Sequence, residues 1–420
     1  MRVVHINLTV SESSSAVHLH KALTAKGIES KVIAVRLDNL SGEDYMEIPS
    51  PGVLFKVIRY LEGKYIRRNL KYTEYPFNTS YFGYDLTELD AVKEADIIHL
   101  HWICGVLNMP GIARLVELGK PVVWTCRDIW AVTGGCHHVY GSCEGYKHDC
   151  GGCPYLHEGC RMATKVLNYK RKWLSPQPVT FIAPSRWLKG VVSEDTILSD
   201  QRVVHIPNAR DFTYFRPYSI AEIEAELDTS VSEFADRINI LIGAMDTKSP
   251  FKGFAYLEKL MEKVLDDAPD LADRIVVHMV GRSEDVGRVL DRYQVKQWGF
   301  IERPAKMAAI YSLCDMFITP SVSDNLPSMV MESLGCETPV LAFDTGGTSD
   351  MLQHQVGGYV ARYKDTDDFY EGLMWILDHN EANALGKAGR KHMLGEFSYD
   401  AVADKHIELY KELLGDHTVG

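Results

Sequence analysis

The chain has 420 residues, which is more than one hydrophobic core usually supports, so its length favours two or more domains. Its 46% of hydrophobic and 24% of charged residues are ordinary for a globular protein. The formal net charge of −12 argues against nucleic acid as a partner, because proteins that bind nucleic acids usually carry an excess of lysine and arginine.

The N-terminal segment MRVVHINLTV is typical of a buried strand, since it lacks the basic region, long apolar run and cleavage site of a signal peptide. No window approaches 18 uninterrupted apolar residues, so we expect no transmembrane helix. Nine cysteines without an export signal are expected to be thiols or metal ligands rather than disulfides. We therefore expect a cytoplasmic protein.

Short apolar runs alternate with amphipathic stretches along the first half of the chain. A stretch such as 16–27 is typical of a helix that Gly27 ends. Strands that alternate with helices indicate βαβ units and a parallel sheet. Buried strands are predicted at 2–8, 31–35, 96–102, 121–125, 179–184 and 203–207.

The pattern restarts after the polar and aromatic segment 208–219, which resembles an interdomain linker. Further strands are predicted at 238–243, 274–281, 295–300, 314–321 and 338–343. We therefore predict an α/β protein with two doubly wound domains, 1–210 and 211–396, which bind ligands in the cleft between them. The amphipathic helix predicted at 397–415 either caps the second domain or packs back on the first.

Two basic stretches run against the acidic average. Residues 56–72 contain six lysines and arginines and one glutamate, and residues 161–173 end in Lys-Arg-Lys-Trp. Basic amphipathic helices are most often solvated faces, but they also suit an anionic membrane surface.

The segment 136–154 concentrates cysteines and histidines. Its cysteines have the spacing C-x6-C-x6-C-x2-C, of which the C-x2-C pair is typical of half a zinc knuckle. A structural metal, free thiols and a disulfide all remain open, and three histidines could replace a ligand. The candidate ligands are Cys136, Cys143, Cys150 and Cys153, with His137, His138 and His148 as substitutes.

The segment 319–352 contains the strongest sign of a binding site. A strand ends near Pro320, Asp324 follows in a loop, and Glu332 lies in a predicted helix whose first turn suits Pro327. The free N–H groups of a helix N-terminus suit a diphosphate, and a carboxylate such as Glu332 can accept from two vicinal ribose hydroxyls. The next strand leads to Gly346-Gly347, where backbone can approach a ligand closely.

This order of strand, acid, helix, acid, strand and Gly-Gly resembles the donor site of retaining GT-B glycosyltransferases of the family 4 type, which carry a Glu-x7-Glu motif. Asp324-x7-Glu332 matches the spacing, with aspartate in place of the first glutamate. The resemblance implies that Asp324 lies by the donor sugar and that Glu332 binds the nucleotide ribose. It also implies that Asn325 and Leu326, between the two acids, belong to the donor site.

The resemblance extends over nearly the whole chain. Lys252-Gly253 is similar to the family's diphosphate-binding pair, and Gly243 belongs to the same implied donor site. Ala244 stands where the family often has an arginine, so Lys252 is expected to serve alone or with Lys248. Gly346 and Gly347 are implied to shape the floor of the donor pocket. Further matches are Pro184-Ser185-Arg186-Trp187 with a PSxW turn, and Asn208, Asp211 and Phe215 with an NxxDxxxF segment.

In the first domain, Arg127-Asp128 occupies a place where the family commonly has histidine and aspartate. Arg127 can contact an anion but cannot act as a base at neutral pH. The resemblance implies retaining transfer without an enzyme nucleophile, in which the leaving diphosphate takes the acceptor proton and Asp128 orients a hydroxyl. His101 and His137 are further catalytic candidates, each weighed against a structural role.

The resemblance implies transfer of a sugar from a UDP- or GDP-sugar to a glycan or polyprenyl-linked acceptor in surface polysaccharide biosynthesis. No catalytic metal is implied, and the enzyme is expected to lie peripherally at the inner face of the cell membrane. The stretch TGGCH…C…CxxCP resembles a subgroup of bacterial polysaccharide glycosyltransferases and implies a loop beside the acceptor. A nucleotide-sugar 2-epimerase, a phosphorylase-like enzyme and a non-catalytic zinc-stabilised binding protein are the alternatives.

Overall fold

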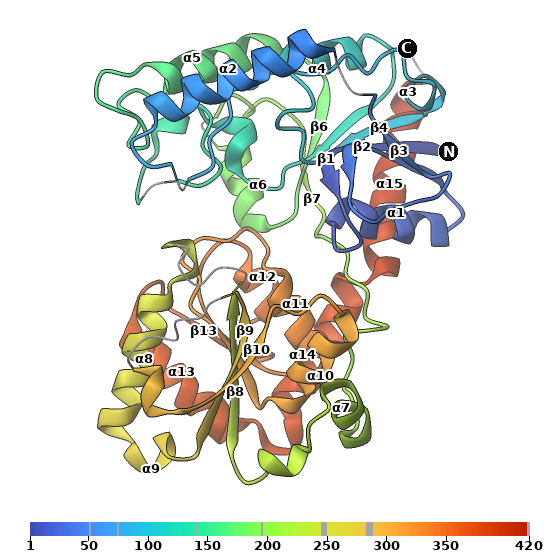
Figure 1. Cartoon of the computed structure of the whole chain (residues 1–420). Coiled ribbons are helices and arrows are strands. Elements are labelled where there is room, and N and C mark those ends of the chain that lie inside the picture. The colour runs from blue at the N-terminus through green and yellow to red at the C-terminus, as the bar shows by residue number, and fades with distance from the viewer. Residues whose placement is uncertain are drawn as a thin grey trace. The chain divides into compact units, whose positions relative to one another are not determined.

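A computed structural model describes residues 1–49, 52–73, 75–139, 141–194, 196–244, 250–282 and 289–417. The chain divides into two compact units (Figure 1). The first comprises Met1–Ala209 and the chain from Val402 onward, and the second comprises Arg210–Ala401. Lys248, which was expected near the donor diphosphate, lies outside the described residues.

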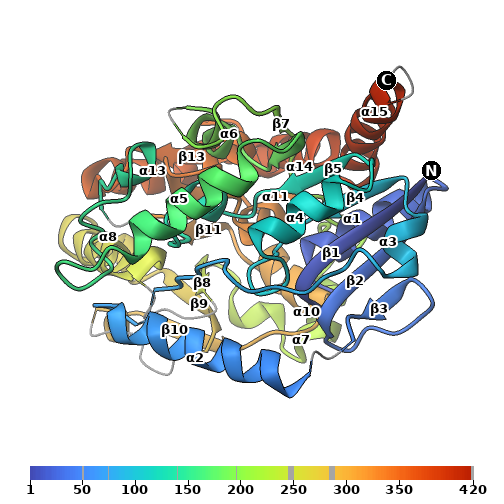
Figure 2. The same cartoon turned by 90° about the horizontal axis from the view of Figure 1, so that it is seen from above.

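A seven-stranded parallel sheet in the order β3-β2-β1-β4-β5-β6-β7 forms the first unit. Its strands are β1 (Arg2–Val10), β2 (Glu29–Leu37), β3 (Tyr45–Glu47), β4 (Ile97–Leu100), β5 (Val122–Thr125), β6 (Val179–Ala183) and β7 (Val203–His205). Its helices are α1 (Ser15–Ala25), α2 (Val53–Asn69), α3 (Asp90–Glu94), α4 (Met109–Val116), α5 (Met162–Leu174), α6 (Arg186–Ser193) and most of α15 (Tyr399–His417). The strand order reverses between β1 and β4, which β2 and β5 flank on either side (Figure 2).

The two faces of this sheet differ in chemistry, because successive side chains of a strand point to opposite faces. On one face, apolar side chains pack against α2, α4 and α5, among them Val4, Ile6, Ile98 and Leu100. On the other face, His5 and His99 are neighbours in register. The hydroxyl of Tyr410 in α15 lies 2.6 Å from Nδ1 of His99, so the C-terminal helix covers this polar face.

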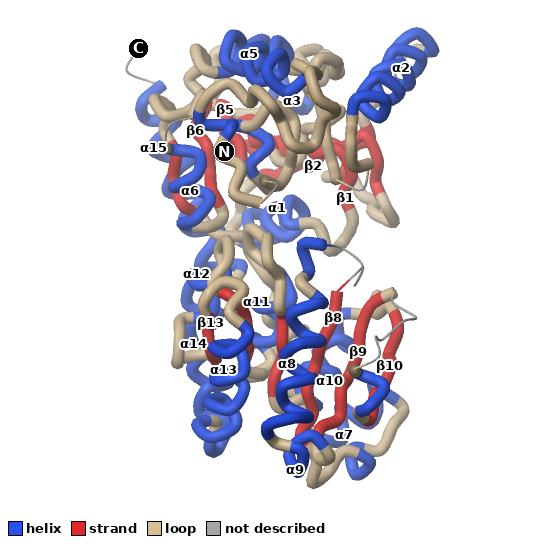
Figure 3. Tube along the Cα trace, turned by 90° about the vertical axis from the view of Figure 1, so that its left-hand side faces the viewer, coloured by secondary structure: helices blue, strands red, loops and turns tan. Residues whose placement is uncertain are grey.

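A six-stranded parallel sheet in the order β10-β9-β8-β11-β12-β13 forms the second unit (Figure 3). Its strands are β8 (Ile238–Ala244), β9 (Ile275–Gly281), β10 (Gln294–Gly299), β11 (Met316–Thr319), β12 (Val340–Phe343) and β13 (Gly358–Ala361). Its helices are α7 (Ile220–Leu227), α8 (Phe254–Asp267), α9 (Pro269–Ala272), α10 (Pro304–Leu313), α11 (Ser328–Gly335), α12 (Thr348–Leu352), α13 (Thr366–His379) and α14 (Ala384–Glu396). Apolar clusters cover both faces, with α8 and α13 on one and α10, α11 and α14 on the other.

The predicted α/β class with two doubly wound sheets is confirmed. Two short strands, β3 and β13, which contain three and four residues, were not predicted from the sequence. The segment 208–219 differs from a free linker, because Phe212 and Phe215 are buried in the core of the second unit. In the basic end of α5, Lys170 is fully buried, whereas Arg171 and Lys172 are exposed to solvent.

Candidate active site

In the second unit, the strand order reverses between β8 and β11, and the loops that follow these strands flank that point. Ligands of doubly wound sheets bind at such a switch point, outside the carboxyl ends of the strands. The amide of Val322 donates to the carbonyl of Phe251 at 2.8 Å, and the amide of Gly347 donates to the carbonyl of Asn325 at 2.7 Å. Hydrogen bonds therefore join the loops that follow β8, β11 and β12.

Two glycines allow these loops to approach each other. Gly253 and Gly346 have φ angles of 65° and 55°, in the left-handed region that favours glycine. A Cβ at Gly253 would overlap the carbonyl of Pro320, and a Cβ at Gly346 would overlap the carbonyl of Asp324. Gly243, the residue before the last of β8, lies against Val280, which leaves no room for a side chain there either.

Lys252 and Asp324 meet at the switch point. Their Nζ and Oδ2 atoms lie 2.9 Å apart, although 72 positions separate the residues in the sequence. The Lys252 side chain is 34% exposed and that of Asp324 23% exposed, so a ligand can reach both. The pair brings together the two residues that the resemblance assigns to the donor diphosphate and the donor sugar.

Glu332 lies on α11 and is buried. One of its carboxylate oxygens forms an ion pair with Arg210, and the other accepts a hydrogen bond of 3.1 Å from the Tyr311 hydroxyl. Helix α11 begins at Ser328, one residue after Pro327, which was expected inside its first turn. The side chain of Leu326 packs in the core of the second unit, so only its backbone is available to the loop surface.

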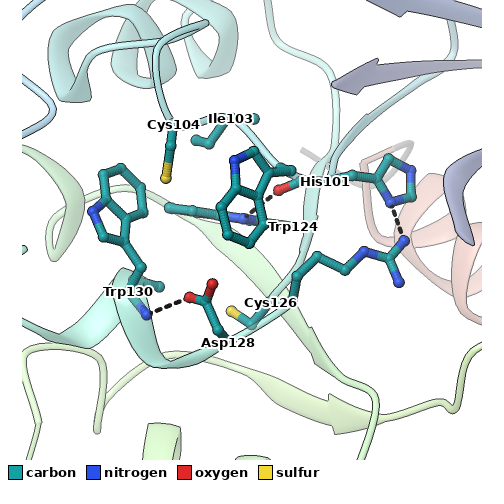
Figure 4. Close-up of a pocket in the computed structure, with 10 residues that line it drawn as sticks. His101, Ile103, Cys104, Trp124, Cys126, Asp128 and Trp130 are labelled. Atoms are coloured by element: carbon teal, nitrogen blue, oxygen red, sulfur yellow. Dashed lines mark hydrogen bonds between the residues drawn. The ribbon is translucent and has the colours of Figure 1, made fainter. Parts of the chain in front are cut away.

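In the first unit, a pocket lies at the carboxyl ends of β4 and β5 (Figure 4). Asp128 lines it and accepts a hydrogen bond of 2.7 Å from the Trp130 amide. The other Asp128 oxygen lies 2.7 Å from Nδ1 of His137, whose Nε2 lies 2.7 Å from the side-chain oxygen of Asn78. His137 is 1% exposed and stacks on Trp102, whereas the Asp128 side chain is 14% exposed. Asp128 is therefore the accessible member of this pair, and His137 orients it.

Arg127 lines the same pocket, but its side chain is turned toward the polar face of the sheet. Its Nη2 donates to Nδ1 of His101 at 2.7 Å, and Nη1 donates to the side chain of Asn208. Burial lowers the pKa of Arg127 to about 10, which leaves it charged at neutral pH. Since Arg127 can only donate, His101 must carry its proton on Nε2 and donate it to Nδ1 of His5, 2.9 Å away. His101 is 1% exposed, and this network places it away from solvent.

The nitrogens of His5, His99 and His101 lie within 4.8 Å of one another, a cluster that was not predicted from the sequence. Both nitrogens of His99 already have partners, in Tyr410 and in the Thr125 hydroxyl at 2.7 Å. The charge of Arg127 also opposes a bound cation. We therefore interpret the cluster as a buried hydrogen-bond network rather than a metal centre.

The cysteine loop holds no disulfide, because all nine cysteines of the chain are free thiols. Cys150 is buried, and Cys136, Cys143 and Cys153 are partly buried. His137 is held by Asp128 and Asn78, so it is not free to replace a cysteine as a ligand.

Several residues of these sites gave no local signal in the sequence. Arg210 lies in the supposed linker, Tyr311 in the largely apolar helix α10, and Asn78 in an irregular loop. Each contacts its partner across a large sequence separation, 122 residues for Arg210 and Glu332 and 59 for Asn78 and His137. The alternation of histidine with apolar residues, at His5 in β1 and at His99 and His101 in and just after β4, could have pointed to the polar face of the first sheet.

Two doubly wound parallel sheets, with polar side chains at the carboxyl ends of their strands, define the GT-B class of fold. Residues 13–214 match the family described as Glycosyltransferase Family 4, and residues 236–379 match the family described as Glycosyl transferases group 1. The chain therefore belongs to the glycosyltransferases of the family 4 type.

Among curated relatives, the chain is 25% identical over 300 residues to WcaC of Escherichia coli K12, which carries the name of a colanic acid biosynthesis glycosyl transferase. That alignment covers 68% of this chain and 67% of WcaC. The chain is 24% identical to alpha-maltose-1-phosphate synthase of Mycolicibacterium smegmatis, over 51% of this chain and 58% of that protein. The chain thus spans between about half and two thirds of the length of these relatives.

Solved structures share the fold over almost the whole chain. Sucrose-phosphate synthase of Thermosynechococcus elongatus is 16% identical with a TM-score of 0.66, over 99% of this chain and 100% of that chain. HepE of Anabaena, solved with UDP and glucose, is 13% identical with a TM-score of 0.63, over 98% and 100% of the two chains. At these identities the likeness defines the fold and not the substrate.

Proposed function

We propose that this glycosyltransferase moves a sugar from a UDP- or GDP-sugar to a glycan or polyprenyl-linked acceptor in surface polysaccharide biosynthesis, with retention at the anomeric carbon. The observation that carries the proposal is the Lys252–Asp324 pair at the switch point of the second sheet. The name of WcaC, and the UDP and glucose bound to HepE, support a nucleotide-sugar donor and a polysaccharide product.

The second unit is the proposed donor site. In the absence of donor, Lys252 and Asp324 neutralise each other. A donor diphosphate would replace Asp324 as the partner of Lys252, because two phosphates carry more negative charge than one carboxylate. The Asp324 carboxylate would then accept hydrogen bonds from the sugar hydroxyls. Glu332 has one hydrogen-bond partner on each oxygen, so it retains acceptor capacity for the ribose hydroxyls. Gly346, Gly347, Asn325 and the backbone of Leu326 complete this proposed site.

The first unit is the proposed acceptor site. Asp128, held by His137 and the Trp130 amide, would orient the attacking hydroxyl. In the proposed retaining step, the bond between the anomeric carbon and the diphosphate oxygen breaks, and the acceptor oxygen bonds to the same face of the sugar. The departing diphosphate takes the acceptor proton, so neither Arg127 nor the buried His101 acts as a base.

Nucleotide binding tests this proposal. UDP, GDP and their hexose conjugates are titrated into the purified chain, and stabilisation is followed by thermal shift, because a ligand that binds the folded state raises its apparent stability. We expect Lys252→Ala to weaken binding by about 10- to 100-fold, since a charge-assisted contact contributes about 1.5–3 kcal/mol. The exposed Lys259→Ala in α8 is the matched control.

Equal nucleotide binding by the Lys252→Ala and Lys259→Ala variants would contradict the proposal that Lys252 belongs to the donor site. Donor consumption that requires an acceptor separates a transferase from a 2-epimerase. The anomeric configuration of the product, measured by proton NMR, tests retention.

We further propose that α2 docks this enzyme on an anionic membrane surface. Only Glu62 and Ile66 of its 17 residues are buried. Its outer side exposes six large apolar residues, at 46–78% of their surface: Val53, Leu54, Val57, Tyr60, Leu61 and Tyr65. Exposed basic residues lie on the same helix and just beyond it: Lys56, Lys64, Arg67, Arg68 and Lys71.

A helix side that carries both apolar and basic residues suits a membrane with negatively charged headgroups. The apolar side chains enter the lipid, and the lysines and arginines contact the headgroups. The rest of the chain is acidic, which makes this basic patch the part that such a surface attracts. In the described part of the chain, no helix has the length and apolar character needed to cross a bilayer.

A further inference from the structure

Lys170 in α5 is a fully buried lysine that the proposed transfer reaction does not use. Its ammonium donates to the carbonyls of Trp130 and Thr133, the second at 3.1 Å, and lies 3.7 Å from the centre of the Trp130 ring. In the described part of the chain it forms no ion pair, so backbone carbonyls rather than carboxylates are its direct partners. Lysines are almost never buried in this way, because the charge is costly to remove from water.

The partners of Lys170 belong to the turn that carries Asp128. Asp128 directly precedes a single 3₁₀ turn, Ile129–Val132, and caps it by accepting a hydrogen bond of 2.7 Å from the Trp130 amide (Figure 4). Lys170 binds the carboxyl end of the same turn, where backbone carbonyls concentrate partial negative charge. Asp128 and Lys170 therefore hold opposite ends of one turn.

Trp130 connects these two charged residues. Its amide donates to Asp128, and its carbonyl and ring contact Lys170. Its indole N–H donates to the carbonyl of Asn78 at 3.1 Å, and its ring lies parallel to that of His137, with 6.1 Å between the centroids. Since His137 is the other residue that contacts the Asp128 carboxylate, a displaced Trp130 would disturb both contacts that fix it.

The charge of Lys170 is maintained at neutral pH. Burial lowers the pKa of Lys170 to about 8, and the thiols of Cys104 and Cys136, the Asp128 carboxylate and the thiol of Cys150 favour the charged form. An ammonium can bind two carbonyls and an aromatic ring at once, whereas an apolar side chain of similar length donates to none of them. Because apolar residues often replace buried charges without loss of stability, stability alone does not account for a lysine here.

We propose that Lys170 is a positioning residue of the proposed acceptor site. Its ammonium fixes the carbonyl and the ring of Trp130, and Trp130 fixes the Asp128 carboxylate that would orient the acceptor hydroxyl. Lys170 does not touch the acceptor itself, because its side chain is fully buried. The role in transfer rests on the proposed function, but the effect of Lys170 on Asp128 can be measured without any transfer.

The test follows the Trp130 amide and indole by NMR in the full chain labelled with 15N-tryptophan, which contains seven tryptophans. Trp130→Phe assigns the two signals. We expect Lys170→Met to accelerate hydrogen exchange of the Trp130 amide by about tenfold, the effect of losing about one hydrogen bond. The matched variant Lys165→Met changes an exposed lysine of the same helix and should leave the exchange within about twofold of the unmodified chain.

Two further measurements separate positioning from a structural role. In the unmodified chain, the Trp130 indole signal should titrate with a midpoint of about 8, because the ammonium beside the ring loses its proton there, and Lys170→Met should abolish this titration. Urea denaturation should show that Lys170→Met keeps or raises the unfolding midpoint. A lowered midpoint with faster exchange of every tryptophan amide would identify Lys170 as merely structural and overturn the proposal.

Equal exchange of the Trp130 amide in the Lys170→Met and Lys165→Met variants would also overturn it. So would a Trp130 indole signal that does not titrate in the unmodified chain between about pH 7 and pH 10. That measurement needs no substitution at Lys170, so it remains decisive even if Lys170→Met fails to fold.

Transfer itself gives the readout that depends on the proposed function. Lys170→Met should lower kcat with a glycan acceptor by about as much as Asp128→Asn does, and it should leave UDP and GDP affinity unchanged, because Lys252 and Asp324 lie in the other unit. If Asp128→Asn has no effect on transfer while the Trp130 amide still responds to Lys170→Met, the proposed acceptor site is wrong, but Lys170 still positions Asp128.

Discussion

The pairing of Glu332 with Arg210 makes the proposed ribose ligand a structural residue as well. Both side chains are about nine-tenths buried, and Tyr311 occupies the second carboxylate oxygen. Loss of one partner of a buried pair leaves an uncompensated charge, which is far more destabilising than loss of an exposed pair. Substitutions at Glu332 therefore have to be interpreted against their effect on folding.

We predict that Glu332→Ala lowers the free energy of unfolding by about 3–5 kcal/mol, because it leaves Arg210 buried without its carboxylate. Urea denaturation measures this. Glu226→Ala, which breaks the exposed pair with Arg303, should cost about 0.2–1 kcal/mol. Equal losses for the two variants would mean that the Glu332–Arg210 pair is not buried in solution. Glu332→Gln keeps an acceptor for Tyr311 and is the variant for nucleotide binding.

At the scale of the elements, the two basic helices, α2 and α5, differ in which of their side chains the rest of the first unit buries. In α5, Lys170 is buried and donates a hydrogen bond to the carbonyl of Trp130, beside the pocket that Asp128 lines. In α2, the basic and apolar side chains share one exposed side, and only two residues face the sheet. The sequence pattern was the same for both, so the difference comes from which side of each helix the rest of the unit covers.

For α2, we predict that reversal of Arg67, Arg68 and Lys71 to glutamate weakens binding to phosphatidylglycerol vesicles by about 100-fold, since each basic residue near such a surface contributes about 1 kcal/mol. Co-sedimentation measures the bound fraction. The control reverses three exposed lysines of the second unit, Lys259, Lys387 and Lys391, and changes the net charge equally. Indistinguishable binding by the two triple variants would rule out docking through α2.

Across the whole molecule, buried histidines are concentrated in the first unit. Burial lowers the pKa of His5, His99 and His101 well below the ordinary value, and neighbouring charges, including Arg127, lower it further. Burial also lowers the pKa of His406 in α15, to about 4. These side chains are neutral in the folded chain at pH 7, and they gain protons on unfolding at any pH below about 6.5.

We therefore predict that stability falls as the pH drops from about 6.5 to 5, because the unfolded chain binds protons that the folded chain excludes. Each such histidine contributes up to about 1.4 kcal/mol per pH unit. Urea denaturation at several pH values measures the slope. His406→Met removes one histidine whose Nδ1 contacts only its own helix, at Val402, so it should flatten the slope by that amount. An unchanged slope would show that His406 is protonated in the folded chain.

The sequence by itself determined the architecture and the position of the loops of the proposed donor site. Buried strands, helix periodicity and glycines at loop ends are local properties, and they placed most strands of both sheets. The acid–helix–acid order around Asp324 and Glu332 was also local, because a strand, a loop and a helix follow one another directly in the chain.

Only the tertiary structure decided which side chains meet. Lys252 reaches Asp324, Arg210 reaches Glu332, and α15 brings Tyr410 to His99 across 311 residues. Such contacts depend on the order of strands in a sheet and on which helix face is covered, and neither property leaves a periodic trace in the sequence. For the same reason the sequence pattern could not reveal that Lys170 is buried, or that His137 contacts the Asp128 carboxylate and orients it.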